Sequence, residues 1–306
     1  MKCNYSKVFI LLLGILYSVP SFTQSGLTNS SHLIEEFNNG QIDWTAQVIE
    51  ARGKSYINRE KFKIEAQAID MAQLGAEAIA KANLLQIIQD VKVTRITSVS
   101  DLMNQSDSVR TVTEGVIRGA RTVGPPTITP DAVEVTVRMR LYDQGGLAPA
   151  IEPFLPLSKY EKVQVNELPG RTSQRQSPVQ ITGTTAGRPG TTQVLLPLGD
   201  TSALLLNFDQ NKYNPSIFPV LVDEEGNVLL DLSEKLEKSK KEYQKYIEMA
   251  ERVSKDTNFR KGIEMVEAIQ NVDGTIRIAN VKKKAKLKKI LNILKEVGAF
   301  AIPLLL

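Results

Sequence analysis

The lone cysteine of the 306-residue chain, Cys3, most strongly limits what the chain can fold into. It lies ahead of an N-terminal apolar run, within a segment that is typical of a secretory signal and is removed after export. A mature chain without Cys3 has no disulfide, no zinc thiolate site and no thiol nucleophile. Its stability must therefore come from ordinary hydrophobic cores.

The signal segment has the three expected parts. Lys2 and Lys7 form a basic start, residues 8–19 are apolar, and residues 20–24 are small or polar. We predict a signal peptide over residues 1–23 and a secreted mature protein in the periplasm or associated with the outer membrane. The alternative is an N-terminal membrane anchor, but the run is shorter than the roughly 20 residues of a spanning helix.

The composition predicts a soluble globular chain. With 42% hydrophobic and 24% charged residues, 306 residues suffice for two domains with their own cores. The net charge of +4 includes Lys2 and Lys7, so the mature chain is close to neutral. This balance does not favour a nucleic-acid partner.

Residues 24–40 are polar and are expected to be disordered, and residues 41–156 are expected to form a first domain. Its first strand is predicted from the alternation of Ile42 to Val48, closed by Gly53, and a long helix is predicted over residues 59–90. The helix residues expected to pack on the sheet recur every three or four positions; they are Ile64, Ala68, Met71, Gly75, Ala78, Ala82 and Leu85.

Three further strands are predicted in this domain. Residues 91–99 are rich in Val, Thr and Ile, residues 116–123 resemble them, and Val133 to Leu141 alternate strictly between apolar and polar side chains. Turn residues around Pro125 and Pro130 indicate that the last two strands are antiparallel. One helix over one face of a mostly antiparallel sheet is the expected arrangement.

The second half is predicted to be another α+β domain. Residues 157–193 are rich in Ser, Thr, Gln, Gly and Pro and read as a polar linker, leaving residues 194–306 for the domain. Its expected elements are hairpins around residues 223–227 and 273–274, helices ending near Val253 and Val297, and an edge strand within residues 300–306. The expected fold class is therefore α+β, with two small domains, each a mostly antiparallel sheet covered by helices.

A family resemblance adds to this interpretation. Residues 44–141 contain Ala51-Arg52-Gly53, the helical segment of residues 80–85, Gly115 to Ala120 and the alternating strand. This region resembles the domain of the LPP-type surface lipoproteins, and is similar to the N-terminal domain of flagellar assembly protein T. Residues 214–219 and 222–226 resemble the C-terminal region of larger, uncharacterised members of that group.

The resemblance implies an envelope domain that mediates assembly or contacts between envelope structures, with no known active site. This chain departs from the lipoproteins because Cys3 precedes the apolar run, whereas a lipidated cysteine follows it directly. Direct lipid anchoring is therefore not expected.

The residues offer little catalytic chemistry. The only histidine, His32, is expected to be a solvated residue of the N-terminal tail, and no Gly-x-Ser-x-Gly nucleophile turn occurs. Asp223, Glu224 and Glu225 could contribute to a cation site, but they lack the alternating ligand pattern and read as a charged hairpin tip. No enzyme activity, metal or cofactor is predicted.

A lysine cluster is the one candidate contact site. It could contact nucleic acid, anionic lipid or acidic polysaccharide, although export argues against nucleic acid. It could also simply be the solvated side of a helix whose other side is apolar. Its members are Lys282, Lys283, Lys284, Lys286, Lys288 and Lys289.

The leading hypothesis is a non-enzymatic cell-envelope protein acting in assembly or protein–protein interaction, with envelope proteins or a second copy as partners. The alternative is a binding module for an envelope glycan or anionic lipid.

Overall fold

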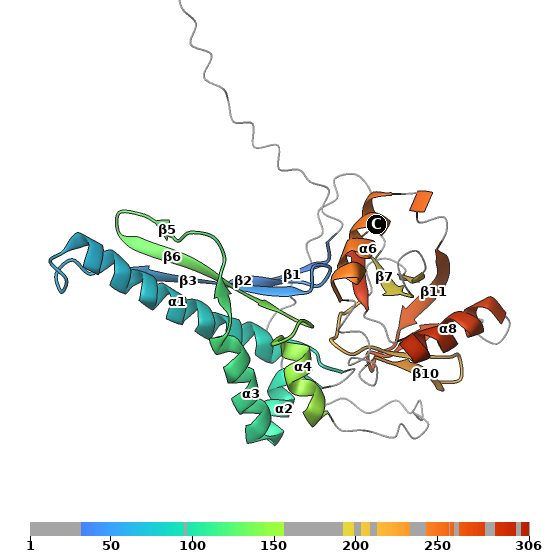
Figure 1. Cartoon of the computed structure of the whole chain (residues 1–306). Coiled ribbons are helices and arrows are strands. Elements are labelled where there is room, and N and C mark those ends of the chain that lie inside the picture. The colour runs from blue at the N-terminus through green and yellow to red at the C-terminus, as the bar shows by residue number, and fades with distance from the viewer. Residues whose placement is uncertain are drawn as a thin grey trace, which may run out of the picture.

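The computed structural model contains two β-sheets with helices packed on them, which confirms the α+β class (Figure 1). It describes residues 32–94, 97–155, 192–198, 203–208, 213–232, 243–256, 258–259, 263–278, 285–297 and 301–305. The predicted signal peptide and residues 157–191 of the predicted linker lie outside the described residues.

The first sheet is antiparallel throughout and has the strand order β1-β2-β3-β6-β4, with β5 also paired to β6. Its strands are β1 (Ile34–Phe37), β2 (Gly40–Asp43), β3 (Val48–Tyr56), β4 (Arg121–Thr122), β5 (Thr127–Ile128) and β6 (Ala132–Arg140). The hairpin of β1 and β2 corrects the expectation that residues 24–40 are disordered, since Ile34 to Phe37 pair with Asp43 to Gly40.

The predicted first strand is wrong in its centre. The chain turns between β2 and β3, where Asp43 Oδ1 accepts hydrogen bonds from the backbone N–H groups of Thr45 and Ala46, at 3.0 and 2.8 Å. Gln47 has a φ of 59°, a left-handed conformation that reverses the chain. An Asx turn of this kind competes successfully with strand alternation. Gly53 lies inside β3 and does not close a strand.

Helix α1 (Glu65–Asp90) covers one face of the first sheet, as predicted. Its buried side differs from the predicted one, because Ala68, Ala72, Ala76, Ala80, Leu84 and Ile88 face the core. Of the predicted row, only Ala68 is buried. Gly53 of β3 allows the close approach, since a Cβ there would lie 2.1 Å from the carbonyl oxygen of Ala76.

The strands predicted over residues 91–99 and 116–123 do not form as predicted. The described part of residues 91–98 contains no strand and Val99 begins a helix; residues 116–118 end another helix, and only Arg121–Thr122 form a strand, β4. Helix α2 (Val99–Gln105) starts at Ser98, whose hydroxyl accepts from the Asp101 N–H while the Asp101 carboxylate accepts from the Ser98 N–H, which is a capping box. Helix α3 (Asp107–Arg118) starts at Ser106. The helix caps at Ser98 and Ser106 outweigh the preference of the β-branched residues for strands. Lys92 and Ser98 form an isolated β-bridge. Helix α4 (Leu147–Ile151) and a 3-10 turn, Glu152–Phe154, follow β6.

The second sheet is mixed, with the order β10-β9-β12-β11-β8-β7-β13. Its strands are β7 (Thr192–Pro197), β8 (Ala203–Phe208), β9 (Val220–Val222), β10 (Val228–Asp231), β11 (Glu264–Gln270), β12 (Ile276–Ile278) and β13 (Ile302–Leu305). Both predicted hairpins and the edge strand are confirmed. The parallel pairs are β8 with β11 and β9 with β12. Strand β7 begins at Thr192, so the last two residues of the predicted linker belong to the sheet.

Helices α6 (Tyr243–Lys255) and α8 (Ala285–Val297) accompany the second sheet and match the two predicted helices within their described parts. In α6, Tyr246, Met249, Ala250 and Val253 are buried. Among the described residues, no helix is both long and apolar enough to cross a membrane.

The two halves pack against each other along two seams. In one, Thr45 Oγ1 donates to the Pro303 carbonyl of β13. In the other, the Ile217 and Phe218 N–H groups donate to the carbonyls of Lys92 and Val93 at 2.8 and 2.9 Å. A single cluster of buried hydrophobic side chains includes residues of both sheets. The halves are therefore joined by packing as well as by the chain between them.

Candidate interaction surfaces

The structure describes only part of the lysine cluster. Lys282, Lys283 and Lys284 lie outside the described residues, whereas Lys286, Lys288 and Lys289 are exposed on α8. Lys286 forms an ion pair with Glu264 of β11, with Nζ and Oε2 at 2.7 Å. The opposite side of α8 is buried through Leu287, Leu291 and Leu294. The described part is thus a packed helix with a solvated basic side.

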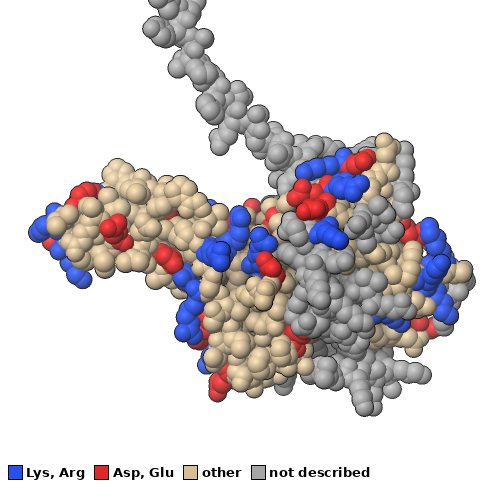
Figure 2. Space-filling model, viewed as in Figure 1, with Lys and Arg blue, Asp and Glu red and all other residues tan. Residues whose placement is uncertain are grey.

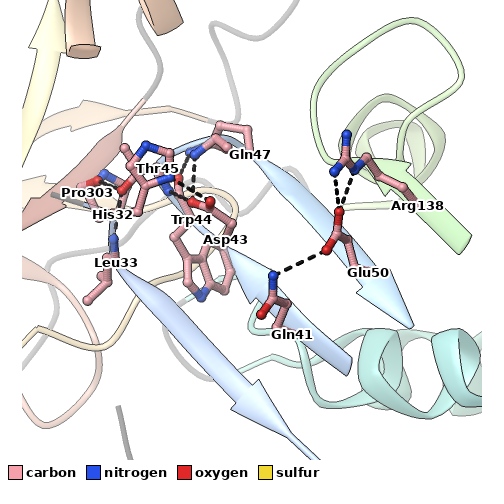
Figure 3. Close-up of polar contacts among 11 residues, drawn as sticks. His32, Leu33, Gln41, Asp43, Trp44, Thr45, Gln47, Glu50, Arg138 and Pro303 are labelled. Carbon is pink, nitrogen blue, oxygen red and sulfur yellow. Dashed lines mark hydrogen bonds and ion pairs between the residues drawn. The ribbon is translucent and has the colours of Figure 1, made fainter. Parts of the chain in front are cut away.

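His32 is not a solvated tail residue. It bridges to Leu304 of β13, and its Nδ1 lies 2.6 Å from Asp43 Oδ2, with 34% of the side chain exposed (Figure 3). The hydrogen bond to Asp43 raises the pKa of His32; the charges of Asp43 and Glu251 add to this, while burial and Lys255 oppose it. Sequence reasoning missed these contacts because the hairpin of β1 and β2, which brings His32 near Asp43, was not predicted, and because Leu304 lies near the other end of the chain.

The residues around His32 are polar, but they are buried and hydrogen-bonded to one another. Leu33 N–H donates to Thr45 Oγ1 at 2.8 Å, and Gln47 Nε2 donates to the Trp44 carbonyl (Figure 3). Thr45, Gln47 and Trp44 are buried, so these groups are engaged in holding the seam together. We interpret the arrangement as structural.

Asp223 likewise has a structural role. It is 5% exposed, and Oδ1 accepts from the Glu225 and Asn227 N–H groups at 2.9 and 2.8 Å. These bonds hold the turn between β9 and β10. No group of three or more His, Cys, Asp or Glu side chains within the described ranges could hold a metal ion.

Strand β3 has an open edge. Its pairing with β2 ends at Ala51, and the Arg52 N–H donates to the Asn39 carbonyl at 2.7 Å; beyond this point no described strand pairs with that side of β3. A groove of about 450 Å³ lies there, lined by Asn38, Asn39, Arg52, Lys54, Ile79 and Asn83, among others. The Arg52 carbonyl is already bonded to Asn83 Nδ2. This leaves a short edge around Lys54, beside which Glu134 also lines the groove.

Helix α1 presents a second apolar side to the solvent. Ile64 is 66% exposed, Met71 44% and Leu74 60%, and Ala78 and Ala82 are also exposed. We call these five residues the α1 row. At 100° per residue Met71, Leu74, Ala78 and Ala82 share one side of the helix, and from Met71 to Ala82 they extend about 17 Å. Ile64 is the extended residue just before the first turn. The row lies on the arm formed by β3, β5, β6 and α1, which projects from the rest of the molecule (Figure 1).

Sequence analysis identified most of the α1 row as apolar but predicted that it packs on the sheet, whereas the structure leaves it exposed. Four of its members, Ile64, Met71, Ala78 and Ala82, belong to the row predicted to pack on the sheet. Because α1 is apolar on two sides, periodicity could not decide which of them is buried. Figure 2 shows that the visible face of the arm carries few charged side chains between its tip and the body.

Neither a scan against protein-family models nor a search of curated proteins finds a match to this chain. The functional interpretation therefore rests on the geometry.

Proposed function

We propose that the mature chain is a non-enzymatic cell-envelope protein that acts in assembly, binding other proteins in the periplasm or at the outer membrane. The α1 row carries this proposal. Soluble proteins seldom leave neighbouring large apolar side chains in water unless another surface covers them. Met71 and Leu74 are such neighbours on one side of a well-packed helix, and Ile64 is exposed just before its first turn.

Two sequence features support the location. Residues 8–19 have the length and composition of a signal sequence, and residues 44–141 resemble the LPP-type domain of envelope proteins. A domain in which α1 packs over an antiparallel sheet fits a contact role.

The test is an affinity pull-down of the mature chain from gently solubilised envelopes, at low and moderate salt. We expect a discrete, salt-resistant protein partner that is lost with Leu74→Lys and kept with Ile269→Lys. Leu74 and Ile269 are matched, being 60% and 57% exposed, but Ile269 lies in the second sheet. Equal recovery with both variants, or a chain found wholly in the cytoplasm on fractionation, would contradict the proposal.

The alternative function, binding an envelope glycan or anionic lipid, is favoured by one observation: Lys288 and Lys289 are exposed on α8. It is tested by sedimentation with anionic vesicles or acidic glycans. Salt-sensitive binding that is lost when Lys282, Lys284 and Lys288 become Glu would support the alternative, because such contacts are electrostatic.

A further inference from the structure

We propose that the open edge of strand β3 binds an extended segment of a partner protein, in which acidic side chains alternate with apolar ones. The segment adds a strand to the first sheet, in line with β2 and beside the second half of β3. This surface is separate from the α1 row. It gives the protein a second contact beyond the proposed function and does not depend on it.

The open edge presents backbone groups that can pair with an added strand. The Arg52 N–H donates to the Asn39 carbonyl on the β2 side of β3. Because successive residues of a strand direct their N–H and C=O groups to opposite sides, Lys54 and Tyr56 direct theirs to the same side as Arg52. Pairing with β2 has already ended at Ala51, and no described residue hydrogen-bonds to the backbone of Lys54 or Tyr56 on this side.

The charges at the edge favour acidic side chains in the added strand. Arg52 and Lys54 are exposed on the face of the sheet opposite α1, and neither forms an ion pair with a described residue. On the same face, Glu50 is bonded to Arg138 (Figure 3), and Glu134 lies opposite Lys54 on β6, on the far side from the edge. An added strand places its side chains about 5 Å from Arg52 and Lys54, and about 10 Å from Glu134.

Helix α1 offers apolar surface beside the same edge. It packs mainly on β3, which is the edge strand beyond Ala51, so one flank of the helix extends past the sheet. Ile79, which is 42% exposed, and Asn83 line the groove at this flank. Side chains of an added strand alternate between the two faces, so every second one points toward Ile79 and the others toward Arg52 and Lys54. This is the reason for the alternation of apolar and acidic residues.

A second copy of this chain does not match the open edge as well. Two copies paired through β3 bring Arg52 and Lys54 close to their own counterparts, and like charges oppose such pairing. The open edge is also short, since Lys54 and Tyr56 are its only residues within β3 that direct backbone groups outward beyond Arg52. We therefore expect a segment of another protein that binds weakly and reversibly.

Residue-resolved NMR of the mature chain tests the pairing, with a short synthetic peptide in which valine alternates with glutamate as the probe. We expect the peptide to slow hydrogen exchange of the Lys54 and Tyr56 amides. The Ser55 amide faces β6 and should not change. Two control peptides separate charge from backbone pairing: one has lysine in place of glutamate, and the other has a methylated backbone nitrogen at each residue. Neither should protect these amides.

Variants of the chain test the charges. Arg52→Gln combined with Lys54→Gln should weaken peptide binding about tenfold, because two exposed charge pairs are lost. Arg121→Gln combined with Lys289→Gln removes the same charge from exposed positions elsewhere and should leave binding unchanged. Leu74→Lys should also leave it unchanged, which separates the open edge from the α1 row. Circular dichroism of each variant checks that the fold is retained.

Unchanged exchange at Lys54 and Tyr56 with the peptide in excess would overturn the proposal, as would equal protection by either control peptide. An equal loss of binding in the two charge-matched double variants would also overturn it, because that pattern reflects general attraction to a cationic chain. Protection that grows with chain concentration in the absence of peptide would assign the open edge to a second copy. Each of these results leaves the proposed function standing, because its pull-down depends on Leu74.

Discussion

His32 contributes to stability in its charged form, because Asp43 and Glu251 favour the imidazolium and raise its pKa. A raised pKa in the folded state means that the stabilisation is fully present below the unfolded value of about 6.5. It is then lost as the pH rises through the folded value. Lys255 on α6 limits the effect by opposing the charge.

Replacing His32 with Gln should therefore lower the melting temperature more at about pH 6 than at about pH 9. The measurement is thermal unfolding of both chains across this range, followed by circular dichroism. A difference between them that stays constant with pH would show that the Asp43 contact does not depend on protonation.

Gly53 is the residue that sets the distance between α1 and β3. An alanine there would place its Cβ 2.1 Å from the Ala76 carbonyl oxygen and 2.3 Å from the Ala80 nitrogen, both backbone atoms that cannot move alone. We expect Gly53→Ala to lower the free energy of unfolding by about 3 kcal/mol or more, measured by urea denaturation. Gly115→Ala is the control: its Cβ would meet nothing within 4 Å, and in the middle of α3 it should stabilise by about 0.5–1 kcal/mol.

At the scale of elements, the start of α2 depends on the capping box between Ser98 and Asp101. The hydrogen bonds from the Ser98 hydroxyl and backbone lower the pKa of Asp101. We expect Ser98→Ala to cost about 1 kcal/mol of stability at neutral pH. Ser108→Ala, at an exposed position early in α3, should have almost no effect. Equal losses in the two variants on urea denaturation would contradict a specific cap.

Sequence patterns predicted those elements in which one signal dominates. The alternation of Val133, Val135 and Val137 fixes which face of β6 is buried, and turn residues at Asp223 and Asp273 mark two hairpins. Prediction failed where two signals competed. At Ser98 a helix cap prevailed over β-branched neighbours, and in α1 two apolar sides left the buried one undetermined.

At the scale of the whole molecule, Thr45 joins the two sheets. Its buried hydroxyl accepts from the Leu33 N–H and donates to the Pro303 carbonyl. Thr45→Val keeps the shape but leaves both backbone groups without this partner, so we expect a loss of about 2 kcal/mol. Hydrogen exchange of residues 301–305 should become faster. Thr127→Val, at an exposed site on β5, should change neither quantity.

The seams between the halves could not be predicted from the sequence. Thr45 and Pro303 lie 258 positions apart, and no local pattern marks either residue as a contact. The same holds for His32, whose sequence surroundings suggested a tail. The candidate site was visible in part, since the α1 row was recognised as apolar, but its exposure follows only from where the sheet lies.

The central claim is that the α1 row contacts protein in the envelope. A photo-activated cross-linking amino acid placed at Leu74, with Ile269 as the matched exposed control, tests it in intact cells that produce the protein. The account predicts discrete protein adducts from position 74 and none of the same kind from position 269. Absence of protein adducts at position 74, with the chain exported and folded, would contradict it.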